Sequence, residues 1–202
     1  MRIIVTGGLG FIGSAFVRHA TSKGAECIVI DNMTYAADKN RLNGYNYELV
    51  IKDICDDIAW ACKDAHYIVN FAAESHVDNS IKDGKPFVKT NVEGTYNMLE
   101  IARQIPSLKR FVQISTDEVY GDIKGSKPST EFDRLNPSSY YSATKAAAEM
   151  LVMAAGRTYD LPHIITRTCN NFGVDQHNEK FLPTIFNSIK NNIPIPIYGD
   201  GE

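Results

Sequence analysis

Two groups of side chains in this sequence have the residue types that move protons. Thr116, Asp117 and Glu118 follow one another in STDEVYG, which places a hydroxyl beside two carboxyls. Tyr141 and Lys145 stand at i and i+4 in YYSATK, so an expected helix there puts both on one face. Because a nearby ammonium stabilises a phenolate, we expect Lys145 to lower the pKa of Tyr141 and make it a general base.

Both groups also have a simpler interpretation. Asp117 and Glu118 could be a solvated turn capped by Thr116, and the tyrosine and lysine could be surface side chains. The position of Asp117 and Glu118 favours a catalytic role, because the apolar-rich run RFVQI at residues 110–114 predicts a buried strand just before them. Ligands of open α/β sheets bind outside the carboxyl ends of the strands. Neighbouring strand residues point to opposite faces, so both acids can serve one substrate only if the strand has already ended.

A glycine-rich turn near the amino terminus predicts a dinucleotide site. GGLGFIG at residues 7–13 follows the β-branched run RIIVT at residues 2–6 and leads into an expected helix over residues 11–23. In that context the early glycines let the backbone approach a pyrophosphate, and the last lets helix and sheet pack closely. The cofactor-binding residues expected in this turn are Gly7, Gly10, Phe11, Ile12 and Gly13.

Asp31 ends the next expected strand, residues 27–30, where a carboxylate would accept hydrogen bonds from the adenosine ribose. A carboxylate there repels a 2'-phosphate, so NAD is favoured over NADP, although an aspartate at a strand end can also be a turn residue. Asp53 and Ile54 end the third strand on the same edge of the sheet. We expect them to flank the adenine.

The chain alternates strand and helix patterns. Further strands are predicted at residues 47–51, 67–71, 111–114 and 163–166, and further helices at 87–105, 140–159 and 181–190, with an extended segment at 193–198. This predicts an α/β fold, a Rossmann-type doubly wound parallel sheet followed by the beginning of a small, incomplete substrate-binding lobe. The expected domains are residues 1–167, the NAD-binding domain with the catalytic residues, and residues 168–202, the start of that lobe.

Composition narrows the function classes. With 21 basic and 24 acidic residues the net charge is -3, and no basic stripe favours nucleic acid or a membrane surface. No apolar run approaches a membrane span and no signal peptide is visible, so a cytoplasmic protein is expected. No metal site is expected, because the cysteines show neither CxxC pairing nor a ligand-like spacing with the histidines. They are Cys27, Cys55, Cys62 and Cys169.

Motifs along nearly the whole chain resemble the extended short-chain dehydrogenase/reductase superfamily and, within it, the nucleotide-sugar 4,6-dehydratases of the dTDP-glucose type. STDEVYG discriminates best, because related 4-epimerases lack the Asp-Glu pair. The motifs that carry the resemblance are TGGLGFIGS, DNMTY, FAAESHVDNSI, the Thr90-Asn91 pair, STDEVYG, YYSATK, CNNFG and the Glu179-Lys180 pair.

The resemblance implies an NAD-dependent elimination without net redox change. Tyr141 would take the proton of the sugar 4-hydroxyl while hydride leaves C4, and Thr116 would hydrogen-bond the reacting oxygen. The 4-ketone acidifies the C5 proton, which Glu118 would remove. Asp117, kept protonated, would donate to the departing 6-hydroxyl before hydride returns to C6. Repulsion between two neighbouring carboxyls is one way to separate their pKa values as this requires.

The resemblance also implies binding residues beyond the glycine turn. For the cofactor these are Asn32, Met33, Thr34, Phe71, Ala72, Ala73, Ser75, Thr90, Tyr141, Lys145 and Asn171. For the nucleotide-sugar they are Ser75, Thr116, Asn170, Lys180, Phe181, Pro196, Ile197 and Tyr198. The substrate implied is dTDP-glucose or UDP-glucose, and a homodimer paired through the two long helices is expected by analogy.

Members of this family continue beyond the point equivalent to Glu202. We therefore expect a fragment or a chain that has lost its substrate lobe, which binds NAD but dehydrates sugar nucleotide weakly or not at all. Two other interpretations remain open. One is another NAD-dependent nucleotide-sugar enzyme, a 4-epimerase or a decarboxylase, and the other is a non-catalytic NAD-binding or assembly module.

Overall fold

A six-stranded parallel sheet forms the centre of the protein, in a computed structural model that describes residues 1–122 and 127–197. The strands lie in the order β3-β2-β1-β4-β5-β6, with every neighbouring pair parallel. Their bounds are β1 Arg2–Thr6, β2 Glu26–Asp31, β3 Glu48–Ile51, β4 Tyr67–Asn70, β5 Arg110–Thr116 and β6 His163–Thr168. This order is that of the Rossmann fold, so the predicted fold class is confirmed.

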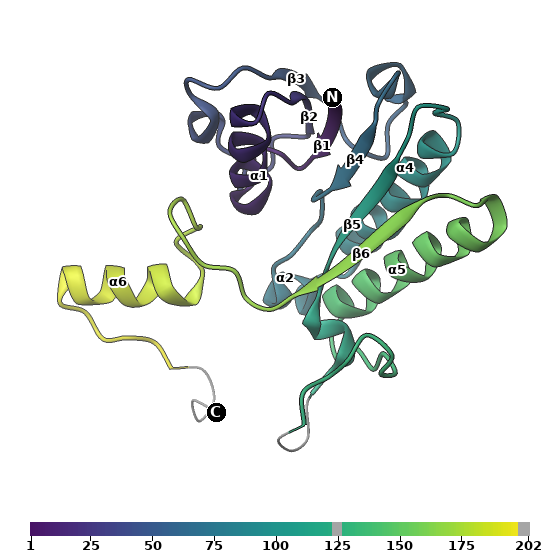
Figure 1. Ribbon diagram of the computed structural model, residues 1–202. Coiled ribbons are helices and arrows are strands. Elements are labelled where there is room, and N and C mark those ends of the chain that lie inside the picture. The colour runs from purple at the N-terminus through teal and green to yellow at the C-terminus, as the bar shows by residue number, and fades with distance from the viewer. Residues whose placement is uncertain (123–126, 198–202) are drawn as a thin grey trace. The chain divides into compact units, whose positions relative to one another are not determined.

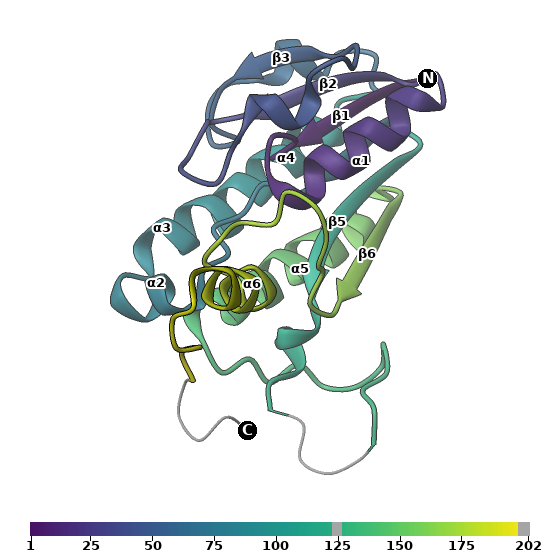
Figure 2. The same ribbon diagram turned by 90° about the vertical axis from the view of Figure 1, so that its left-hand side faces the viewer.

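Helices cover both faces of the sheet. α1 lies on one face, and α4 and α5 lie on the other (Figures 1 and 2). The helix bounds are α1 Phe11–Ser22, α2 Val77–Lys82, α3 Lys85–Phe87, α4 Thr95–Ala102, α5 Tyr140–Tyr159 and α6 Phe181–Asn191. Short 3-10 helices are η1 Lys39–Leu42, η2 Ala59–Cys62 and η4 Asp117–Tyr120, and η3 Val88–Gly94 is a π-helix.

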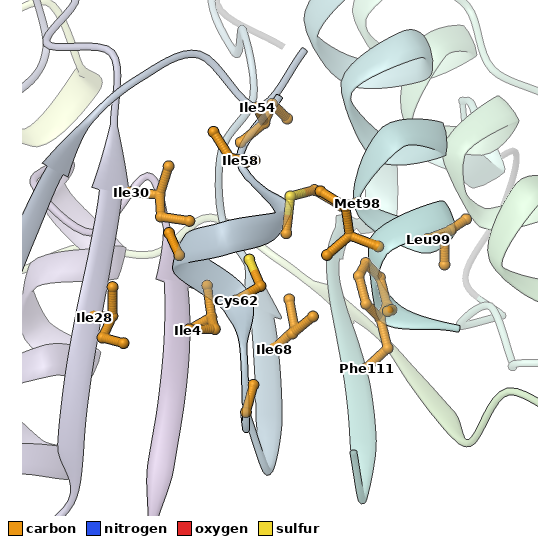
Figure 3. Close-up of a cluster of buried hydrophobic side chains, with 14 of the residues drawn as sticks. Ile4, Ile28, Ile30, Ile54, Ile58, Cys62, Ile68, Met98, Leu99 and Phe111 are labelled. Atoms are coloured by element: carbon orange, nitrogen blue, oxygen red, sulfur yellow. The ribbon is translucent and has the colours of Figure 1, made fainter. Parts of the chain in front are cut away.

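Alternation along the strands divides the core into two clusters. Ile4 and Phe111 face the α4 and α5 side and pack with Met98, as Figure 3 shows. Val5 points the opposite way and packs with Val17 of α1. Because successive strand residues point to opposite faces, a strand covered on both sides is apolar at successive positions. This explains the continuous apolar runs that identified the strands in the sequence.

The helix predicted over residues 87–105 is more complex than expected. The structure has one continuous helical segment made of α3, the π-helix η3 and α4, which ends at Ala102. Arg103 and the residues after it form tight turns, in which Gln104 N–H donates to Ile101 and Ile105 N–H to Ala102. Pro106 follows and has no N–H to continue a helix.

Three strands, β2, β5 and β6, are longer than predicted, and the residues added at their carboxyl ends are polar. β5 continues past Ile114 through Thr116, which pairs in register with Thr168 of β6. The apolar pattern stops at Ile114 because the last residues are polar, so the sequence signal ends before the strand does. The two extra residues of β5 place Thr116 at the carboxyl edge of the sheet. β3 and β4 are each one residue shorter than predicted.

The chain divides into two compact units, Met1–Cys169 and Asn170–Glu202. The first contains the whole sheet. In the second, α6 ends at Asn191, its C-cap residue Asn192 has a left-handed φ of 53°, and residues 193–197 form neither helix nor strand. The interpretation of residues 168–202 as the start of a sugar-nucleotide lobe stays a prediction.

Candidate active site

The glycine turn joins β1 to α1 with very little space around its backbone. Gly7 has a φ of 64°, and a Cβ on it would lie 2.8 Å from the backbone nitrogen of Ala72. A Cβ on Gly13 would lie 2.2 Å from the carbonyl oxygen of Gly7. Gly10 is the N-cap of α1, with no capping side chain and no acidic residue in the first turn. The helix terminus therefore presents backbone N–H groups that favour an anion.

Asp31 holds this turn against the end of β2. Its two carboxylate oxygens accept hydrogen bonds from the backbone N–H groups of Leu9, at 3.0 Å, and Met33, at 2.9 Å. The residue is only 7% exposed. Asp31 thus has a structural task that its place in the sequence did not reveal, beside the ribose contact predicted for it.

Asp53 lies beside the end of β2, because the Asn32 side-chain amide donates to it at 3.3 Å. Partial burial acts to raise the pKa of Asp53, but hydrogen bonds from Cys55 and Asn32 and the charge of Lys89 leave the pKa lowered overall. Asp53 is therefore ionised at neutral pH. Ile54 is 3% exposed and packs into the core, so its backbone is the part that can face an adenine.

Asn91 in the π-helix fixes the loop after β4, where residues 71–75 were assigned to the cofactor. Its side chain accepts from Glu74 N–H at 2.9 Å and donates to the Glu74 carbonyl at 3.0 Å. It also donates to the Thr144 hydroxyl on α5 at 3.0 Å. No role was predicted for Asn91 from the sequence. An amide on the side of a helix expected to face the core is the feature that could have indicated this role.

Thr116 is the last residue of β5, and Asp117 and Glu118 open η4. The Thr116 hydroxyl accepts the Glu118 N–H and donates to the Asp117 carboxylate, both at 3.3 Å. The strand has ended before the acids, so the alternation that would separate two strand neighbours no longer applies. The condition for the two acids to act together is met.

Tyr141, in the first turn of α5, lies next to this group. Its phenol shares a hydrogen bond with Thr116, and its ring packs edge-on to Phe87 with centroids 6.5 Å apart. Burial raises the pKa of Tyr141 to about 12, with the charges of Glu118 and Asp117 adding to the rise and the Thr116 bond opposing it. Both carboxyls and the phenol therefore interact in one place.

Lys145 does not lower the pKa of Tyr141 as the sequence predicted. Its ammonium donates to the backbone oxygen of Ile114 at 2.5 Å and is 5% exposed. Burial lowers the pKa of Lys145 to about 8, partly offset by the charge of Glu149. The expectation is wrong because burial and the two carboxylates raise the pKa of Tyr141, and Lys145 is not among the groups that shift it.

A family model for the NAD dependent epimerase/dehydratase family matches residues 3–202 of this chain. The chain belongs to the NAD dependent epimerase/dehydratase family. The family assignment confirms the resemblance inferred from the motifs, and it agrees with the strand order and the glycine turn.

Relatives within the family are similar over the whole chain. The low-salt glycan biosynthesis protein Agl12 of Haloferax volcanii is 49% identical over 100% of this chain and 67% of its own length. The dTDP-glucose 4,6-dehydratase of Haemophilus influenzae is 43% identical over 100% and 65%. A crystal structure of DesIV, a dTDP-glucose 4,6-dehydratase from Streptomyces venezuelae with NAD bound, matches with a TM-score of 0.94 and 42% identity, over 100% and 66%. The chain thus spans about two thirds of their length.

The residues present fit the NAD of this family. The uncapped N-terminus of α1, with a glycine approach too tight for a Cβ, suits a pyrophosphate. Asp31 and the ionised Asp53 lie at the carboxyl ends of β2 and β3, on the same edge of the sheet. Such an edge favours ribose hydroxyls over a 2'-phosphate.

The remaining predicted site residues lie in the second unit, Asn170–Glu202. The side chain of Gln176 donates to the Asn171 carbonyl at 3.0 Å, and Lys180 is the N-cap residue of α6. Phe181 begins α6 and is 74% exposed, as is Ile197. Asn170 and Pro196 are also exposed, and Tyr198 lies outside the described residues. Their roles stay predictions.

Within residues 1–122 and 127–197, no helix is long and apolar enough to cross a membrane. Over the same part of the chain, no three His, Cys, Asp or Glu side chains are grouped so as to hold a metal ion.

Proposed function

We propose that this chain carries the NAD site and the proton-transfer groups of a nucleotide-sugar 4,6-dehydratase of the dTDP-glucose type. The observation that carries the proposal is the meeting of Thr116, Asp117 and Glu118 with the phenol of Tyr141 at the carboxyl end of β5. An epimerase needs a base at the 4-hydroxyl but no acid and base for elimination. The names of the relatives, dTDP-glucose 4,6-dehydratases among them, support the same choice.

Each group is given a task in the reaction. Tyr141 takes the 4-hydroxyl proton, and Thr116 hydrogen-bonds the same oxygen and the phenol. Because the pKa of Tyr141 is raised to about 12, the cationic nicotinamide of NAD would have to stabilise the phenolate when it is bound. When bound, NAD supplies the hydride acceptor at C4 and the hydride donor at C6. Lys145 keeps its proton at about pH 7, because its pKa is lowered only to about 8. The positive charge therefore stays in the site, next to β5.

The elimination needs one carboxyl in each protonation state. Glu118 as carboxylate removes the C5 proton, and Asp117 as acid protonates the departing 6-hydroxyl, so water leaves and a 5,6-double bond forms beside the 4-ketone. Hydride then returns to C6 and Glu118 gives its proton back to C5, which leaves the 4-keto-6-deoxy sugar. The two carboxyls belong to adjacent residues at the start of η4, so both are offered to the same substrate.

In the first unit, NAD would be held by the glycine turn, by the residues after β2, β3 and β4, and by Thr90 of η3. These residues are Gly7, Gly10, Phe11, Ile12, Gly13, Asp31, Asn32, Met33, Thr34, Asp53, Ile54, Phe71, Ala72, Ala73, Ser75 and Thr90. Ser75 and Thr116 of the same unit would meet the sugar nucleotide. In the second unit, Asn171 is proposed for the cofactor, and Asn170, Lys180, Phe181, Pro196, Ile197 and Tyr198 for the sugar nucleotide.

The test is the mass of the product. The protein is incubated with NAD and dTDP-glucose, and in parallel with UDP-glucose, and we expect that any product formed, at a slow rate, is lighter by one water. Glu118→Gln should abolish this product, whereas Glu48→Gln, a change at an exposed carboxylate at the start of β3, should not. A product of unchanged mass, with the 4-hydroxyl inverted, would instead identify an epimerase and overturn the proposal.

A further inference from the structure

A buried ion pair lies behind the candidate active site, and the reaction proposed above gives it no task. Glu149 is 0% exposed and lies on α5, four residues after Lys145. Arg167 on β6 grips it with Nε at 3.0 and 3.1 Å from the two carboxylate oxygens and Nη2 at 2.6 Å from one of them. A planar, bidentate grip of this kind fixes the direction of the guanidinium as well as its position.

The same guanidinium reaches the turn that carries the two acids. Its Nη1 donates to the hydroxyl of Tyr120 at 2.7 Å, and the guanidinium carbon lies 4.9 Å from the centre of that ring. Tyr120 is the last residue of η4, which begins with Asp117 and Glu118. Arg167 therefore contacts both α5, through Glu149, and the acid-bearing turn, through Tyr120.

Other contacts also hold this turn: η4 packs against α5, Val119 is buried, and the Thr116 hydroxyl accepts the Glu118 N–H. The Gly121 N–H donates to the Glu118 carbonyl at 3.1 Å, and the Asn136 N–H donates to the Val119 carbonyl at 3.0 Å. Neither bond connects the turn to α5. Because a hydrogen bond from a charged donor is worth more than a neutral one, the Arg167 bond is the stronger restraint on the far end of η4.

We propose that Arg167 is a positioning residue: anchored by Glu149, it holds Tyr120 so that Asp117 and Glu118 keep a fixed distance from Tyr141 on α5. This inference rests on the proposed dehydration. Elimination depends on the two acids and oxidation at C4 depends on Tyr141, so their relative placement decides whether the second step follows the first. A shift of about 1 Å in such a group can lower a rate by orders of magnitude.

The experiment measures how readily the backbone of η4 opens, and it does not require catalysis. Amide hydrogen exchange of a peptide covering residues 117–121 is compared in the unmodified protein, in Tyr120→Phe and in the double variant Glu149→Leu/Arg167→Met. The double variant removes the link but replaces the ion pair with apolar side chains of similar size, so that no buried charge is left alone. We expect exchange in the turn to be about tenfold faster in both variants, with α5 unchanged.

The chain contains a matched control. Arg103 pairs with Glu100 at 2.7 Å and lies 5.0 Å from the centre of the Tyr159 ring, in an exposed place away from the acids. Tyr159→Phe should alter neither exchange at residues 117–121 nor turnover. In protein that turns over, Tyr120→Phe should lower kcat about tenfold with KM unchanged.

The outcomes separate the two proposals. Unchanged exchange at residues 117–121 in both variants would overturn the link between Arg167 and the acids, and so would faster exchange with kcat unaltered. A product of unchanged mass in the unmodified protein would overturn the proposed dehydration, while the exchange measurement would still decide the link.

Discussion

The ammonium of Lys145 donates to the backbone oxygen of Ile114, 2.5 Å away, and so fastens α5 to β5 from within the protein. The charge is 5% exposed, and its burial lowers the pKa of Lys145 to about 8. A cation whose pKa is lowered on folding destabilises the folded state. This contact thus keeps a positive charge buried between α5 and β5 at a cost in stability.

Replacing Lys145 with methionine should make the protein more stable and less active. Between the folded pKa of about 8 and the ordinary value of 10.5 the unfolded chain binds more protons, so the penalty is full below about pH 8 and fades as pH rises. We expect Lys145→Met to raise the free energy of unfolding by up to about 3 kcal/mol near pH 7. Urea unfolding should show the gain shrinking toward about pH 10, and Lys63→Met, at an exposed site, should show no such trend.

The pKa of Tyr141 should respond in opposite directions to changes at its two neighbours. Glu118→Gln removes a negative charge that disfavours the phenolate, so the pKa should fall. Thr116→Val removes a hydrogen bond that favours the phenolate, so the pKa should rise. Carbon NMR of labelled tyrosine, followed upward in pH with Tyr141→Phe to assign the signal, measures both shifts. Movement in the same direction in both variants would contradict this account.

Methyl groups added in the glycine turn should have graded effects. In Gly13→Ala the new carbon would lie 2.2 Å from the Gly7 carbonyl, so the backbone must move, and we expect a loss of about 1–3 kcal/mol of stability and of NAD binding. In Gly10→Ala the distance to the same oxygen is 3.2 Å, which a small adjustment relieves. Thermal unfolding and NAD titration should both place Gly10→Ala between the unmodified protein and Gly13→Ala.

Asp31→Asn should lower the stability of the folded protein without changing its preference for NAD over NADP. Both carboxylate oxygens accept backbone N–H groups, and an amide can accept only one of them in the same orientation. We expect a loss of about 1–3 kcal/mol in unfolding free energy and weaker NAD binding without a gain in NADP binding. The control is Asp57→Asn, at an exposed carboxylate. Tight NADP binding by Asp31→Asn would show that the structural task is minor.

Much of the fold could be predicted from the sequence because its signals are local. Apolar runs that end in polar residues marked all six strands, and the GGLGFIG turn between the first strand and the first helix marked the nucleotide edge. Alternating strands and helices leave few topologies other than a parallel sheet with right-handed crossovers. Strand ends were less certain, since Ser115 and Thr116 pair with β6 although neither is apolar.

The sequence alone determined which residue types arrive together at the carboxyl ends of the strands. Only the tertiary structure decided what those residues contact. Lys145 donates a hydrogen bond to Ile114 and is not among the groups that shift the pKa of Tyr141. Arg167 forms an ion pair with Glu149, although no local sequence pattern pairs the two residues. The reason is physical: periodicity records which face a side chain occupies, whereas its pKa and its partners depend on burial and on charges brought in from distant parts of the chain.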